Sequence, residues 1–254
     1  MKVFTSANEK QLIGLLSTVI LLLLWKIISI KINAEIILPP PEDVILRLAL
    51  ITQNKSFWQA VGNTTARTLY GFILSFSAGF ITGIACGSSS RINAALSPLI
   101  SVIRTVPVMS VILIAMIWFK TDMVPVFVCF LMIFPIITAN VSQGIREVDR
   151  SLIEMASAFK LSKYNILFHI TIPSTIPFVL AGVKAAVGVA WKSVIAAEVL
   201  SQPVKAIGTG IQFSQMNLET AEVIAWTVIA VILSKVSELA VETIIKSLKW
   251  RSYQ

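Results

Sequence analysis

Long apolar runs alternate with short polar segments along the chain, and each run is long enough to cross a lipid bilayer as a helix. A spanning helix needs about 20 mainly apolar residues. Six such runs cover residues 11–31, 66–87, about 98–118, 124–143, 176–198 and 221–239. The pattern therefore predicts an all-α, polytopic membrane protein with about six transmembrane helices.

The composition supports this fold class. Of 254 residues, 56% are hydrophobic and only 13% are charged, whereas soluble domains carry roughly 25% charged residues. So few polar side chains cannot cover a soluble globule of this size. The first run lacks a small-residue cleavage site, so it is interpreted as a retained helix rather than a signal peptide.

Several function classes are disfavoured by what the sequence lacks. The formal charge of +8 comes without a clustered basic face, so no nucleic-acid partner is expected. Cys86 and Cys129 lie in apolar runs and His169 is the single histidine, so neither a disulfide nor a metal site is expected. No Walker-type GxxxxGK[ST] motif occurs, and the runs lack a convergent His, Asp or Glu cluster, so no catalytic residues and no enzyme activity are expected.

Glycines at four-residue spacing mark one face of the second run. Gly79, Gly83 and Gly87 share this face, and small residues at such spacing let a second helix approach closely. We predict close helix packing here rather than a ligand site.

Ionisable residues and prolines inside the runs are candidates for a substrate pathway, because charged groups at membrane depth usually face protein or water and prolines there often kink a helix at a cavity. The candidates are Arg104, Pro107, Trp191, Lys192 and Glu198. For Arg104, snorkelling from a helix end is the alternative. For Lys192 it is a salt bridge between helices or a lipid-headgroup contact, and for Trp191 an interfacial anchor.

The segment 151–177 is the one long, charged interval between apolar runs, and its pattern predicts two short helices. Ser151 followed by Glu154 matches the pattern of a capping box. A second helix is expected from Ser162 to about Thr171, with a break at Ile172-Pro173.

The distribution of cations predicts the side on which this segment lies. Six crossings place both termini and residues 146–173 on one side, together with Lys2, Lys10, Arg91, Arg146, Arg150, Lys160, Lys163, Lys246, Lys249 and Arg251. The other side holds fewer cations, mainly Lys31, Arg47, Lys55, Lys120 and Lys205. The positive-inside rule therefore places both termini and the segment in the cytoplasm.

The same segment resembles the cytoplasmic EAA loop of ABC-importer permeases. That loop reads Glu-Ala-Ala, three residues, Gly, nine residues, Ile-x-Leu-Pro. Here Glu154-Met155-Ala156, Lys160 and Ile170-Thr171-Ile172-Pro173 have the same spacing. Met155 and Ile172 depart conservatively, whereas Lys160 replaces a glycine that would allow a left-handed turn. The stretch Leu38-Pro39-Pro40-Pro41-Glu42-Asp43-Val44 is similar to the helix entry of the nitrate, sulfonate and taurine branch.

The resemblance implies a type I ABC-importer permease fold in four parts. These are an N-terminal transmembrane helix (1–35), an outer interfacial link (36–63), a permease core (64–245) with its coupling loop (146–173), and a basic cytoplasmic tail (246–254). It implies that the loop contacts an ATPase through Ser151, Glu154, Met155, Ala156, Phe159, Lys160, Ile170 and Pro173. For Glu154, the alternative is that it only caps its own helix. Gly208 and Gly210 resemble a Gly-Leu-Gly element of the last outer loop, and are interpreted as an outer gate or a docking surface.

The partners that this resemblance implies are two ATPase subunits, which would bind ATP and Mg²⁺, and an external or periplasmic substrate-binding protein. We expect a homodimer in the bacterial inner membrane, with no cofactor bound by this chain. The substrate would be a small anion, similar to nitrate, sulfonates or taurine, or a vitamin-like molecule. The alternative is a secondary transporter or channel without an ATPase; a secondary transporter predicts an inverted repeat that is not seen.

Overall fold

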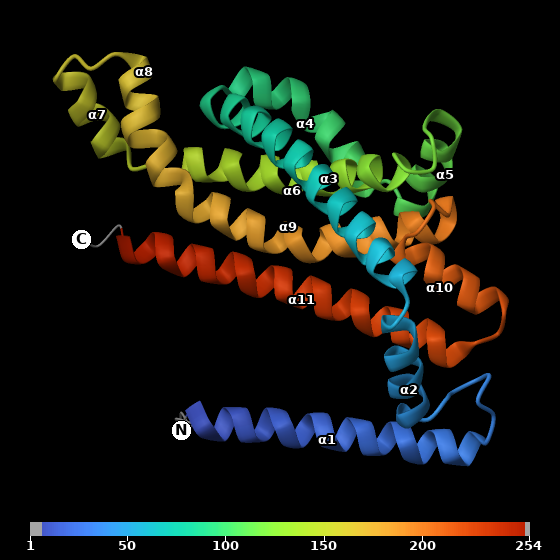
Figure 1. Cartoon of the computed structure of the whole chain (residues 1–254). Helices are drawn as coiled ribbons and strands as arrows, with labels where there is room; N and C mark the ends of the chain where they lie inside the picture. The colour runs from blue at the N-terminus through green and yellow to red at the C-terminus, as the bar shows by residue number, and fades with distance from the viewer. Residues whose placement is uncertain (1–6, 252–254) are drawn as a thin grey trace.

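The protein is described here by a computed structural model that covers residues 7–251, and it consists of helices joined by short connections (Figure 1). The long helices are α1 (Ala7–Ile32), α3 (Lys55–Ser88), α6 (Val124–Arg146), α9 (Ile172–Ser201) and α11 (Thr220–Arg251). The shorter ones are α2 (Pro41–Thr52), α4 (Ser90–Thr105), α5 (Val108–Trp118), α7 (Arg150–Ala158), α8 (Lys163–Ile166) and α10 (Ile207–Met216). No strand occurs within residues 7–251, so the all-α prediction is confirmed.

By length and composition, four of the described helical segments can cross a membrane: 12–32, 55–88, 124–146 and 164–201. The pair α4 and α5 makes a fifth if it counts as one broken span. The sixth predicted run lies in α11, which runs alongside α9 but carries Lys235, Glu238 and Glu242. The second span begins at Lys55 rather than at 66, so the predicted link 36–63 ends inside a helix.

Helices α3 and α6 pack closely against each other, and glycines permit this close approach. A Cβ atom added at Gly79 would lie 2.9 Å from the Cβ of Ile137, and one at Gly83 would lie 2.6 Å from the Cβ of Val141. Gly87 meets Ile145 in the same way. The glycine face predicted from four-residue spacing is therefore confirmed, and α6 is the helix that packs on it.

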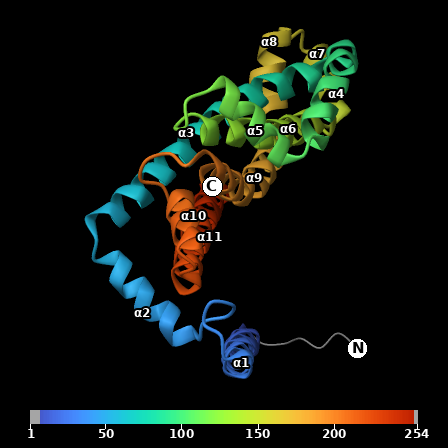
Figure 2. The same cartoon turned by 90° about the vertical axis from the view of Figure 1, so that its right-hand side faces the viewer.

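Helix α6 also packs against α9. Ile133, Ile137 and Val141 of α6 form one buried cluster with Ala186, Ala190 and Val194 of α9, among others. Helix α11 then packs on α9 and α10, where Trp226 and Ile207 are buried. Figures 1 and 2 both show that α1 lies apart from this body and is joined to it through α2.

The third predicted run is broken rather than kinked. Helix α4 ends at Thr105, Val106 is extended, and Pro107 precedes the first turn of α5, so the two helix axes differ by 98°. Proline disfavours the helical conformation of the residue before it, which accounts for a full break at Val106.

The predicted helix break at Ile172-Pro173 is wrong. The chain instead passes from α8 through a π-helical turn (Leu167–Thr171) into α9, and Ile172 N–H donates to Leu167 O across this wider turn. Pro173 stands at the start of α9, where a missing N–H costs little. The π-helical turn therefore lets the helix continue past a residue that ordinarily ends it.

Candidate functional site

The most prominent candidate site is the pair α7 and α8, which projects from the body at the upper left of Figure 1. Met155 is 51% exposed and Phe159 is 75% exposed, four residues apart, while Ala156 is fully buried. Glu154 is also exposed. Large apolar side chains on a projecting, polar-flanked loop indicate a protein-binding surface.

Two aromatic residues that the sequence reasoning missed extend this surface. Tyr164 and Phe168 are 66% and 46% exposed, and their ring centroids lie 4.4 Å apart. Their four-residue spacing was the available signal. Ile170, in contrast, is half-buried in the π-helical turn, and Pro173 is exposed beyond it.

The start of α7 is capped by Asp149 and not by Ser151. The Asp149 carboxylate accepts a hydrogen bond from Ser151 N–H at 2.8 Å, so the capping-box prediction is corrected. Hydrogen bonds from the Ser151 backbone and side chain hold the pKa of the Asp149 carboxyl below its usual value. A negative side chain also suits the positive end of the helix dipole.

The end of α7 explains how lysine can replace the expected glycine. Lys160 has a φ of 55°, in the left-handed region, and Leu161 N–H donates to Ala156 O at 3.1 Å. This hydrogen bond and the left-handed residue are the features of a Schellman motif. The turn that the family obtains with glycine is therefore formed here with Lys160.

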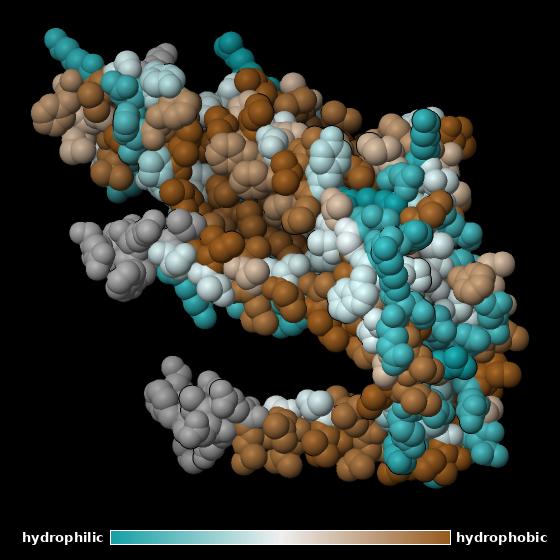
Figure 3. All heavy atoms as spheres, viewed as in Figure 1, coloured by the Kyte–Doolittle hydropathy of each residue, from teal (hydrophilic) through white to brown (hydrophobic). Residues whose placement is uncertain are grey.

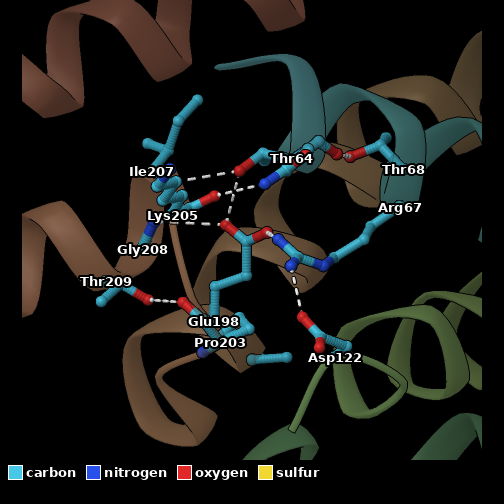
Figure 4. Close-up of polar contacts among 12 residues, drawn as sticks. Thr64, Arg67, Thr68, Asp122, Glu198, Pro203, Lys205, Ile207, Gly208 and Thr209 are labelled. Atoms are coloured by element: carbon cyan, nitrogen blue, oxygen red, sulfur yellow. Dashed lines mark hydrogen bonds and ion pairs between the residues drawn. The ribbon is translucent and has the colours of Figure 1, made fainter. Parts of the chain in front are cut away.

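A second polar site lies at the far end of α9, around Glu198 (Figure 4). This carboxylate is fully buried. It accepts hydrogen bonds from Thr64 Oγ1 at 2.9 Å, Arg67 Nη1 at 3.0 Å and Gly208 N–H at 3.2 Å. These donors come from α3 and α10, so the carboxylate joins three helices.

Arg67 extends the network to the connection between α5 and α6. Its Nη2 atom lies 2.6 Å from Asp122 Oδ1, and the Asp122 side chain is 63% exposed. Thr64, Arg67 and Asp122 were missed by the sequence reasoning. The signal for Arg67 was its place at the edge of an apolar run, but no local pattern relates it to Glu198.

The two glycines of the predicted outer loop lie in the first turn of α10 rather than in a turn between helices. Gly208 packs directly on Glu198, and a Cβ atom there would collide with that side chain. A Cβ atom at Gly210 would lie 2.6 Å from the Trp226 ring. Both are therefore required by close packing, and their gate or docking role stays a prediction.

The five pathway candidates lie in three separate places. Trp191 is buried and donates to Ser237 Oγ at 3.0 Å, whereas Lys192 is exposed at a groove of about 480 Å³ between α9 and α11. Glu198 belongs to the network around Arg67, and Arg104 and Pro107 flank the break between α4 and α5. Their role in transport stays a prediction. Within residues 7–251, no group of His, Cys, Asp and Glu could hold a metal ion.

Solved structures of membrane importers share this fold. A chain of the methionine ABC transporter MetNI matches with a TM-score of 0.60 and 15% identity, over 75% of this chain and 96% of its own length. A chain of an amino acid ABC transporter matches with a TM-score of 0.60 and 16% identity, over 80% of this chain and 97% of its own length. The fold is thus that of an ABC-importer permease.

The chain belongs to the family of binding-protein-dependent transport system inner membrane components, whose sequence profile matches residues 75–250. It is 32% identical to the nitrate import permease protein NrtB of Synechococcus elongatus, over 71% of this chain and 68% of NrtB. It is 25% identical to the taurine transport system permease protein TauC of Escherichia coli, over 89% of this chain and 84% of TauC. The bicarbonate transport system permease protein CmpB of a Synechocystis species is 29% identical, over 74% and 70%.

The protein is therefore a multi-pass inner-membrane permease subunit of an ATP-driven importer. Its family is a transport component, and the ATPase is a separate subunit, so the chain itself is not an enzyme. The family implies an ATPase and a substrate-binding protein as partners. These findings support the importer permease and not the secondary transporter or channel.

Proposed function

We propose that this permease carries a small oxyanion across the inner membrane and is coupled to its ATPase through the loop 146–173. The exposed apolar surface of α7 and α8 is the observation that carries the coupling role. Met155, Phe159, Tyr164 and Phe168 would enter a groove on the ATPase, and Glu154 beside them would pair with a basic side chain there. Closure of the ATPase then switches the permease between inward and outward exposure by rigid-body movement.

The proposed orientation places both termini and the coupling loop in the cytoplasm. The start of α1, the end of α11 and the pair α7 and α8 all lie on the left in Figure 1. The cation distribution supports the same side. The parts proposed along the chain are the N-terminal helix (1–35), the outer link (36–63), the core (64–245) and the basic tail (246–254); residues 1–6 and 252–254 lie outside the described structure.

We propose that two copies of the chain form the transport pathway and bind two ATPase subunits. The spanning part of α1 is only 6% buried, and Figure 3 shows an open space between it and the rest of the molecule. A second copy in this space would cover apolar side chains such as Leu21 and Leu23, which are 67% and 55% exposed. ATP and Mg²⁺ would bind to the ATPase subunits, with no cofactor on this chain.

The names of the relatives support an oxyanion as substrate. NrtB is named for the import of nitrate, and TauC and CmpB are named for the transport of taurine and bicarbonate. Each of these compounds carries oxygen atoms that share a negative charge. A substrate-binding protein on the outer side would deliver the ion, and a vitamin-like substrate is the second possibility that the branch suggests.

Co-purification with the ATPase tests the coupling role. The full-length, tagged chain is purified from membranes of its host in mild detergent, and ATPase activity in the eluate is measured. We expect the double substitution Met155→Glu and Phe159→Glu to abolish co-purified activity without lowering the yield of the permease. Phe213→Glu is the matched control, because Phe213 is 67% exposed on α10 at the other end of the molecule. Equal activity from the double variant and the control would overturn the proposal.

A further inference from the structure

A polar groove of about 410 Å³ lies between α4 and α6, next to the start of the coupling loop and away from the network around Glu198. Its polar lining comes from both helices and from the residue that follows α6: Asn93, Ser97, Thr138, Ser142, Gln143, Arg146 and Glu147. Helix α6 is apolar enough to cross the membrane, and α4 is part of the broken span. Such a groove inside a membrane segment needs water or a polar ligand to fill it.

The polar residues form a stripe on each helix. Thr138, Ser142 and Arg146 are four residues apart and share one face of α6. On α4, Asn93 and Ser97 share a face that Ser101 and Arg104 continue toward the helix break. The two stripes meet at the groove, so the polar surface follows the helices over several turns.

Ser142 contributes a hydroxyl group to the groove. This residue is 7% exposed and lies among the groove's lining residues. The Thr138 hydroxyl donates to Phe134 O at 2.8 Å. Because Ser142 lines the groove, its hydroxyl group can bind a polar molecule that lies there.

Arg146 supplies a positive charge at the end of the groove nearest the coupling loop. Its Nη2 atom donates to Cys86 O at 3.3 Å, which fixes the guanidinium at the end of α3. Among the described side chains it forms no ion pair. Glu147 lines the same end of the groove. Guanidinium groups bind oxyanions by charge-assisted hydrogen bonds, which are stronger than neutral ones.

We propose that this groove is a passage site for the transported oxyanion in the half of the membrane nearest the cytoplasm. The Ser97 and Ser142 hydroxyls and the Asn93 amide would replace water around the ion, and Arg146 would draw it toward the cytoplasmic end. Arg104 lies on the same face of α4 toward the helix break, so cations stand on both sides of the neutral donors. The inference rests on the proposed function, since it names the site through which that substrate passes.

Thiol labelling of the full-length chain in inside-out membrane vesicles tests the site. In a Cys86→Ala, Cys129→Ala background, Ser142→Cys is compared with Leu99→Cys, because Leu99 is 58% exposed on the apolar face of α4. The probes are a sulfonate-bearing methanethiosulfonate and its trimethylammonium analogue. We expect the anionic probe to modify the Ser142→Cys thiol about tenfold faster than the cationic probe, because the Arg146 guanidinium lies one turn from Ser142 on the same face of α6 and raises the local concentration of anions.

Two further results are expected at the same site. Ethanesulfonate and nitrate should slow the modification of Ser142→Cys, and Arg146→Gln should remove most of the preference for the anionic probe. Equal rates for the two probes, an unreactive Ser142→Cys thiol, or no protection by either anion would overturn the passage site. Labelling does not require the ATPase, so these results would not affect the proposed coupling through the loop 146–173. The co-purification experiment tests that coupling independently.

Discussion

Lys160 occupies a backbone conformation that is costly for any residue with a side chain. Its φ of 55° is left-handed, and such a conformation costs roughly 1–2 kcal/mol outside glycine. Lys160→Gly should therefore stabilise the end of α7 by about 1 kcal/mol. Hydrogen exchange of the Leu161 amide, which donates to Ala156 O, should slow by roughly fivefold.

Ser162→Gly is the matched control for this change. Ser162 is not left-handed, and its Oγ atom accepts a hydrogen bond from Asn165 N–H at 3.2 Å. Glycine there removes the cap of α8 and should speed exchange at Asn165. If both glycine variants protect the loop equally, strain at Lys160 is not the cause.

The network around Glu198 predicts that loss of Arg67 destabilises the protein more than loss of Asp122. Arg67→Met leaves a fully buried carboxylate without its cation, and removing one partner of a buried pair costs roughly 3–5 kcal/mol. Asp122→Asn should cost less than about 1 kcal/mol, because Asp122 is mostly exposed. Thermal unfolding of the purified protein in detergent measures both.

A double variant shows whether the buried charge of Glu198 or the lost packing of Arg67 causes the loss of stability. Arg67→Met combined with Glu198→Gln should be more stable than Arg67→Met alone, because the introduced amide carries no buried charge and its oxygen still accepts from Thr64 and Gly208. A double variant as unstable as the single one would show that lost packing around Arg67, and not the buried charge, sets the stability.

At the scale of helices, contact between α3 and α6 depends on the absence of side chains. Gly83→Ala should destabilise the protein by about 1–3 kcal/mol, because the added methyl group overlaps Val141. Gly62→Ala on the same helix has nothing within 4 Å, so better helix propensity should stabilise it by up to about 1 kcal/mol. The melting temperatures of the two variants give the comparison, and the same shift for both would contradict the packing argument.

Elements that follow from local spacing could be predicted from the sequence. Apolar runs gave the positions of α1, α3, α6 and α9 because burial in lipid requires about 20 apolar residues in succession. The glycine face of α3 followed from a four-residue repeat, and the loop 146–173 followed from its charge and its spacing of Glu154, Lys160 and Pro173.

Features that depend on contacts between distant segments could not be predicted. Arg67 and Glu198 are 131 residues apart in sequence, and nothing around either residue identifies the other. The sequence pattern predicted Ser151 as the cap of α7, but Asp149 caps the helix. Only the backbone geometry decides which of these nearby residues accepts the hydrogen bond. Pro173 did not end its helix, because the chain enters α9 through a π-helical turn that lies directly before this proline.

At the scale of the whole molecule, the orientation in the membrane can be tested with reporters. Green fluorescent protein fused after Gln254 should fluoresce, and alkaline phosphatase fused after Leu218 should be active, because they report the cytoplasmic and the outer side. The positive-inside rule gives this expectation. An inactive phosphatase at Leu218 together with a dark fluorescent fusion would reverse the orientation and place α7 and α8 outside.

The unbroken path from α8 through the π-helical turn into α9 has a mechanical consequence. Helix α9 has 30 residues and is therefore about 45 Å long. It begins inside the coupling loop and carries Glu198 near its other end, where hydrogen bonds to this carboxylate hold α3 and α10. A tilt of about 10° at its inner end would shift its outer end by about 8 Å if the helix stays straight. In the proposed orientation, a small movement that the ATPase causes at the inner end of α9 would become a larger movement at its outer end.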